Sequence, residues 1–136
     1  EIDLCWRVWL TGQRVMVEPR SKVYHLGGAT LSVDSPFKTM LNHRNNLAML
    51  YRCAPSWQRA LVAVVRPMLD LAAALSYLVQ GKTKSAKAVF VAWRDFLLWH
   101  SRLAQERKTI RANVKCEAPV YHGSIVVRYI FGRKTF

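Results

Sequence analysis

Two carboxylates, an imidazole and a pair of glycines near the start of the sequence are the residues best suited to chemistry. Glu1 and Asp3 open a run with helical spacing of apolar residues, and a carboxylate at a helix N-terminus can act as an ionised base. His25 follows an extended stretch, and its imidazole can bind a divalent metal ion. Gly27 and Gly28 let a ligand approach the backbone closely. A capped helix and a solvent-exposed histidine explain the same stretch more simply.

A second polar group lies on the helix expected from Pro36 to Cys53. Its apolar residues recur mostly every three or four positions, while Lys38, Arg44 and Asn45 fall on the other faces. A guanidinium group can bind a diphosphate through paired hydrogen bonds. The alternative is a solvated basic face without a ligand.

Several short runs occur in the order found in family-2 glycosyltransferases. They are E-I-D-L-C-W-R, G-Q-R-V, P-R-S-K-V-Y-H-L-G-G-A-T-L and K-T-M-L-N-H-R-N-N-L-A-M-L. Residues 1 to about 51 therefore resemble the C-terminal part of these inverting, metal-dependent enzymes of the GT-A type, and bacterial rhamnosyltransferase-like members look closest. A weaker similarity continues to the C-terminus.

The resemblance implies roles for the residues named above. Glu1 matches the catalytic base and Asp3 is the alternative, because the acid that usually precedes this motif is absent here. His25 matches a histidine that completes a manganese or magnesium site. The implied reaction moves a sugar from a nucleotide-sugar donor to a saccharide or lipid-linked acceptor in cell-surface polysaccharide synthesis. The expected substrate contacts are Gly27, Gly28, Lys38, Arg44 and Asn45.

The donor half of such an enzyme is not recognisable in this chain. There is no Asp-x-Asp motif, and no glycine-rich phosphate loop follows a strand. We therefore expect a C-terminal fragment that is inactive alone and binds no metal by itself. Residues 1–53 would form the edge of the catalytic domain and residues 54–136 a helical C-terminal region, and the fragment could self-associate.

Composition limits the other function classes. The chain has 136 residues, 51% of them hydrophobic, and a formal net charge of +13. Such a charge attracts phosphosugars, acidic lipids or nucleic acid. A basic helical nucleic-acid-binding or interaction module is the alternative function, but no known nucleic-acid-binding motif is visible, so we expect no nucleic acid partner. The three cysteines are widely spaced and lack C-x-x-C, which indicates reduced thiols in a cytosolic protein.

Periodicity and capping signals predict a mainly α fold, with long helices plus a short strand pair near the N-terminus. The strand pair would cover about Val15 to Tyr24, interrupted by Pro19. The expected helices are a short first one ending at Gly12, then 36–53, 57–79 and about 85–112. In the tail after residue 124 we expect a short helix, and a strand through Val126, Val127 and Ile130 is the alternative.

The helix expected at 57–79 is apolar around much of its circumference and has basic neighbours. It either packs in a soluble helical hairpin or lies in a membrane interface with basic flanks on anionic lipid, and composition leaves both open. No uninterrupted apolar run reaches the length of about 18 to 20 residues that a spanning helix needs. We expect a cytoplasmic protein, with a peripheral position on the inner face of the cytoplasmic membrane as the membrane-bound form.

Overall fold

The computed structural model describes residues 1–24, 32 and 34–119, and within these ranges the chain forms five helices and no strand. The predicted mainly helical fold is therefore confirmed. The helices are α1 (Ile2–Leu10), α2 (Pro36–Cys53), α3 (Ser56–Val79), α4 (Thr83–Leu98) and α5 (His100–Ala112).

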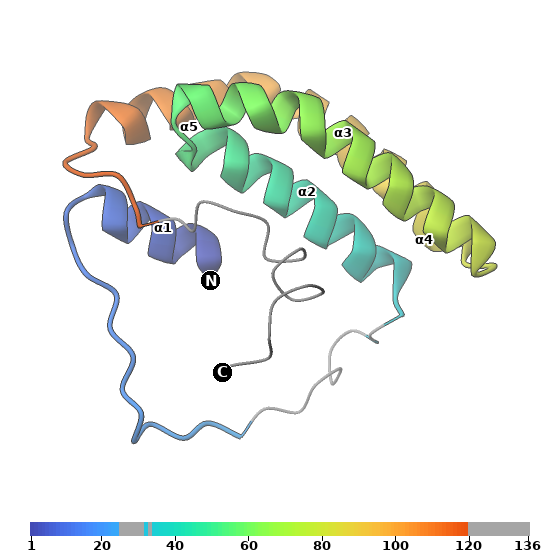
Figure 1. Ribbon diagram of the computed structural model, residues 1–136, viewed down its shortest axis with the longest axis horizontal. Helices are drawn as coiled ribbons and strands as arrows, with labels where there is room; N and C mark the ends of the chain where they lie inside the picture. The colour runs from blue at the N-terminus through green and yellow to red at the C-terminus, as the bar shows by residue number, and fades with distance from the viewer. Residues whose placement is uncertain (25–31, 33, 120–136) are drawn as a thin grey trace, which may run out of the picture.

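Three helical segments lie side by side along most of the molecule (Figure 1). α3 turns back antiparallel to α2, and α4 continued by α5 runs in the same direction as α2. Lys82 Nζ contacts Asp34 Oδ1 at 2.7 Å near the beginning of this parallel pair. Arg52 Nη1 contacts Glu106 Oε2 at 2.7 Å near its end.

Small side chains let α4 pack closely against α2. Ala86, Val89 and Ala92 are buried at helical spacing on α4, and Leu47 and Ala48 are buried on α2. Most other elements contribute fewer buried side chains, so the core is concentrated between these two helices.

The helix α1 packs on the C-terminal end of α2. Trp6 and Leu10 of α1 form a buried cluster with Met49 and Cys53 of α2. The segment after α5 closes over the same cluster, where the Lys115 backbone N–H donates to the Leu10 carbonyl oxygen at 2.8 Å.

The predicted strand pair around Val15 to Tyr24 is wrong. Residues 13–24 form no ladder and run away from the helices with exposed side chains (Figure 1). The consecutive apolar residues Val15, Met16 and Val17 cover no other element, since Met16 and Val17 are 78% and 86% exposed. An isolated two-stranded ribbon is marginal in water, and Pro19 also removes a donor from it.

The helix expected at about 85–112 is divided in two at Trp99. No glycine or proline lies between residues 82 and 118, so the sequence carries no breaker there. The turn redirects α5 over the C-terminal end of α2. Arg107 Nη1 donates there to the carbonyl oxygens of Tyr51 and Ala54 at 2.8 and 2.7 Å.

The other helix boundaries predicted within the described residues are close to the observed ones, and the short helix expected after residue 124 lies outside those residues. The expected 36–53 helix coincides with α2, and Pro36 occupies its first turn after Ser35. Gly12 and Gly81 follow α1 and α3 with φ of 81° and 73°, a conformation that favours glycine. The sequence favours Ser35 and Ser56 as helix N-cap residues. In the structure Ser35 is the N-cap residue of α2 but its hydroxyl makes no capping hydrogen bond, and Pro55 rather than Ser56 is the N-cap residue of α3.

Candidate functional site

The predicted base carboxylates lie at the start of α1. Glu1 is the exposed N-cap residue. Asp3 Oδ2 accepts a hydrogen bond from Arg7 Nε at 3.0 Å, and its Oδ1 accepts one from Arg52 Nη2 at 3.0 Å. Asp3 ties α1 to α2, because guanidinium groups bind both of its oxygens. The hydroxyl group of a sugar acceptor would therefore have to displace an arginine to reach this carboxylate. The base role of Glu1 or Asp3 stays a prediction.

The predicted substrate contacts on α2 are spread along the helix. Arg44 donates from Nε and Nη2 to Asn45 Oδ1 at 3.2 Å, and its guanidinium lies 4.3 Å from the ring centroid of Trp99. Lys38 lies in the first turn of α2. Arg52, the partner of Asp3, is about 21 Å further along the helix from Lys38 at 1.5 Å per residue. The structure therefore brings Arg44 and Asn45 together but places neither Lys38 nor Arg44 beside Asp3.

The predicted metal ligand His25 and the glycines Gly27 and Gly28 lie outside the described residues. Within the part of the chain that the structure describes, no three His, Cys, Asp or Glu side chains are placed to hold a metal ion. Asp3 does not fit a manganese or magnesium site as it stands, because both of its oxygens are bound by arginines. The divalent metal of the intact enzyme stays a prediction.

Sequence reasoning missed a buried polar cluster between α2, α3 and α4. Asp70 is 3% exposed, and its Oδ1 accepts a hydrogen bond from Arg66 Nε at 2.9 Å and lies 2.8 Å from His43 Nδ1. Its Oδ2 accepts a hydrogen bond from Trp93 Nε1 at 2.8 Å. Arg66 Nη1 also donates to the side-chain oxygen of Asn46. The cluster holds three helices in one arrangement.

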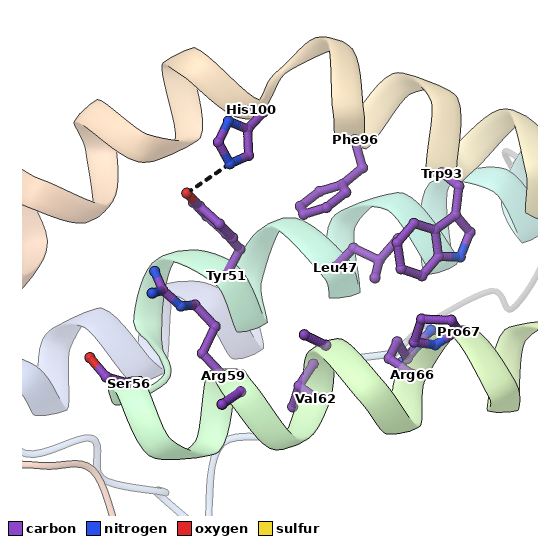
Figure 2. Close-up of a pocket in the computed structure, with 12 residues that line it drawn as sticks. Leu47, Tyr51, Ser56, Arg59, Val62, Arg66, Pro67, Trp93, Phe96 and His100 are labelled. Carbon is purple, nitrogen blue, oxygen red and sulfur yellow. Dashed lines mark hydrogen bonds between the residues drawn. The ribbon is translucent and has the colours of Figure 1, made fainter.

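An apolar cavity of about 470 Å³ lies beside this cluster, between the first half of α3 and the facing parts of α2, α4 and α5 (Figure 2). Leu47, Trp93 and Phe96 supply much of its apolar lining. Tyr51 points toward His100 across the cavity, with 3.1 Å between the hydroxyl and Nε2. The same tyrosine packs edge-on against Phe96, with ring centroids 5.9 Å apart.

A basic pocket of about 420 Å³ adjoins the cavity at the N-terminal end of α3. Burial lowers the pKa of Arg107, and the positive charges of Arg59 and Arg111 lower it further. Glu117 neutralises part of this charge by accepting a hydrogen bond from Arg111 Nη1 at 3.1 Å. The pocket therefore keeps an excess of positive charge. Its lining residues are Tyr51, Ser56, Arg59, Ala104, Arg107, Lys108 and Arg111.

The outer face of α3 is apolar, and none of the other described elements covers it. The three charged residues of α3, Arg59, Arg66 and Asp70, are all partly or fully buried. Their spacing of seven and four residues places them on one stripe, and this signal was available in the sequence. By length and composition α3 could cross a membrane. Only 11% of its most apolar 18-residue stretch is buried against the rest of the protein. Its exposed large apolar residues are Trp57, Leu61, Val64, Val65, Met68, Leu69, Leu71, Leu75, Leu78 and Val79.

Comparison of the chain with models of protein families, with curated proteins and with solved structures finds no match. The functional argument therefore rests on the residues and on their geometry.

Proposed function

We propose that this chain acts at an anionic membrane surface, with the uncovered apolar face of α3 lying at the boundary between lipid head groups and acyl chains. One observation carries this proposal. α3 turns all of its charged side chains toward α2 and α4 and leaves only apolar residues and two serines exposed, apart from its ends.

A face of this size needs an apolar neighbour, because soluble monomers rarely leave a large contiguous apolar patch in water. The net charge of the chain distinguishes between two possible neighbours, a second copy of the chain and an anionic lipid surface. A net charge of +13 makes contact with a second equally basic copy costly and contact with anionic lipid favourable. An interfacial helix with basic neighbours is the known form of such binding.

The charges on α4 favour a position in the plane of the membrane over a spanning one. α4 lies against α3, as the hydrogen bond from Trp93 to Asp70 shows. Lys87 and Arg94 are exposed on α4. A spanning α3 would carry these two cations into the hydrocarbon, where each costs several kcal/mol, about 3 on insertion scales.

We further propose, from the order of motifs in residues 1–51, that the reaction at this surface is transfer of a sugar from a nucleotide-sugar donor to a saccharide or lipid-linked acceptor. A membrane location favours this reaction because a lipid-linked acceptor would be presented there. Since these 136 residues contain no Asp-x-Asp motif, the donor and its divalent ion would be held elsewhere. The chain alone is therefore expected to transfer no sugar, and measurable transfer would contradict that expectation.

Vesicle flotation tests the membrane proposal. The chain is expected to float with phosphatidylglycerol-containing vesicles and less with phosphatidylcholine vesicles, and added salt should weaken the binding. Leu61→Glu with Met68→Glu changes two exposed residues of α3 and should reduce the partition coefficient by about tenfold or more, because each apolar side chain contributes about 1.5 kcal/mol or more on burial.

The control places the same charge away from the membrane-facing surface. Met16→Glu with Val17→Glu alters two exposed residues of the extended segment, which are 78% and 86% exposed, and should bind vesicles far better than the α3 variant. Failure of the chain to bind anionic vesicles would refute the proposal. A stable dimer without vesicle binding would identify a second copy as the occupant, and salt-sensitive binding to an oligonucleotide alone would favour the nucleic-acid module.

A further inference from the structure

The basic pocket and the apolar cavity form one continuous site. Tyr51, Ser56 and Arg59 line both of them. The lining is cationic on the side of α5, where Arg107, Lys108 and Arg111 lie. It becomes aliphatic and aromatic between α2, α3 and α4 (Figure 2). A site divided in this way suits an amphiphile better than a uniformly polar metabolite.

Two cations at the polar end are available for an anionic group. Arg111 already pairs with Glu117, and Arg107 donates to the carbonyl oxygens at the end of α2. Arg59 and Lys108 form no ion pair with any residue in the described ranges. Because α3 begins at Ser56, the positive end of its helix dipole lies at the same end of the site.

Arg59 is also held in position by its surroundings. Its guanidinium lies 5.6 Å from the ring centroid of Tyr51. Tyr51 in turn is fixed by His100 and Phe96. A guanidinium that is oriented before binding loses less side-chain entropy when it forms paired hydrogen bonds with phosphate oxygens.

The apolar end opens onto the uncovered face of α3. Ala60, Ala63 and Pro67 line the cavity and are themselves exposed. A hydrocarbon chain could therefore enter from the side, without passing the cationic end. The volume of about 470 Å³ lies within the range of ordinary ligand cavities.

We propose that this site binds a single anionic lipid, with its phosphate head group between Arg59 and Lys108 and one hydrocarbon chain in the apolar cavity. The inference rests on the proposed membrane location, because the bilayer would supply the lipid. It adds a discrete binding site for one lipid molecule to the general attraction between a basic protein and an anionic surface.

Titration with lysophosphatidic acid below its critical micelle concentration tests the site by isothermal titration calorimetry. We expect this probe to bind about tenfold or more tightly than lysophosphatidylcholine, glycerol 3-phosphate or inorganic phosphate, since a charge-assisted contact and a buried chain each contribute more than about 1.4 kcal/mol. Equal affinity for lysophosphatidylcholine would overturn the role of the cations. Equal affinity for inorganic phosphate would refute the binding of a lipid and would identify a site for phosphate alone.

A pair of matched double variants locates the binding. Arg59→Gln with Lys108→Gln should weaken the affinity for lysophosphatidic acid about tenfold or more. Arg20→Gln with Lys22→Gln removes the same charge from the exposed segment 13–24 and should leave the affinity unchanged. Equal losses in both double variants would overturn the site, and circular dichroism establishes that each variant is folded.

Vesicle flotation of the unaltered chain separates the two proposals. Flotation with anionic vesicles and no binding of lysophosphatidic acid would refute the lipid site alone. Binding of lysophosphatidic acid without flotation would refute the membrane location, and the lipid site would stand.

Discussion

The carboxylate of Asp70, on α3, joins three helices. It accepts hydrogen bonds from Arg66 of α3 and Trp93 of α4, and it lies 2.8 Å from His43 Nδ1 of α2. Asp70→Ala would leave Arg66 and Trp93 without their acceptor and His43 without its partner. We expect the free energy of unfolding to fall by about 1 to 3 kcal/mol, because the partly buried Arg66 would lose its counter-charge and Trp93 Nε1 would lose its acceptor. Urea denaturation followed by circular dichroism measures the change.

Asp34→Ala is the matched control for this prediction. Asp34 pairs with Lys82 at 2.7 Å, but its side chain is 74% exposed. Surface ion pairs contribute little, so the control should change the urea midpoint only slightly. A similar shift for both variants would show that the Asp70 cluster does not hold the three helices together.

At the scale of elements, local signals in the sequence predicted the helices that carry their own boundary residues. The bounds of α2 follow from Pro36 and from the residues before Pro55, and Gly12 and Gly81 mark the ends of α1 and α3. The division at Trp99 has no local signal, because it depends on α5 packing over the end of α2. The predicted strand pair had a local signal but no tertiary contact to support it, because a strand pattern is not stabilised without a partner surface.

The candidate site was less predictable than the helices. Residue types drew attention to Asp3 and Arg44, but in the structure both are engaged by neighbouring protein groups. The basic pocket combines residues of α2, α3 and α5 that are up to 60 positions apart in the sequence. Only the inward stripe of Arg59, Arg66 and Asp70 could have been read from spacing alone. Its recognition would have shown that the opposite face of α3 is free of charge.

Ion pairs joining α1, α2 and α5 make the packing of these helices sensitive to acid. The hydrogen bond from Arg52 lowers the pKa of Glu106 below its ordinary value, and Arg102 lowers it further. A carboxylate with a lowered pKa stabilises the fold above its unfolded-state pKa, near 4.3. That stabilisation is lost as the pH falls through the folded-state pKa. The helices should therefore loosen as the pH falls below about 4.3, the unfolded-state value.

Glu106→Gln tests this account. The variant should be less stable than the unaltered chain at neutral pH, and its free energy of unfolding should fall less steeply as the pH drops below about 4.3. Urea denaturation at several pH values measures both effects. Glu18→Gln makes the same change in the exposed segment 13–24 and should keep the original slope. An unchanged slope in Glu106→Gln would assign the acid sensitivity to other carboxylates.

At the scale of the whole molecule, the arrangement of charge leaves a basic surface with few internal partners. Six of the eight acidic residues form ion pairs with arginine, lysine or histidine. With 21 basic residues against these 8 acidic ones, 13 positive charges have no carboxylate to balance them. An external anionic surface is the natural partner for this excess, and the apolar face of α3 lies on the same molecule.

The position of α3 relative to a bilayer can be measured as a depth profile. Leu61, Met68 and Leu75 are all exposed and lie seven residues apart on one face of α3. Nitroxide labels on single cysteines at these positions would report depth by electron paramagnetic resonance on anionic vesicles. Cys5 and Cys116 would be replaced by serine, whereas Cys53 is buried and its pKa is raised to about 11, so its thiol is poorly reactive.

An α3 that lies in the plane of the membrane places all three labels at one depth, about 5 to 10 Å into the boundary region. A spanning helix would instead place Met68 deeper than Leu61 and Leu75, because seven residues rise about 10 Å along the axis. We expect the uniform profile, since the exposed Lys87 and Arg94 of the adjacent α4 oppose deeper insertion. A maximum at Met68 would contradict it and would require those two cations to reach the head groups or to pair within the bilayer.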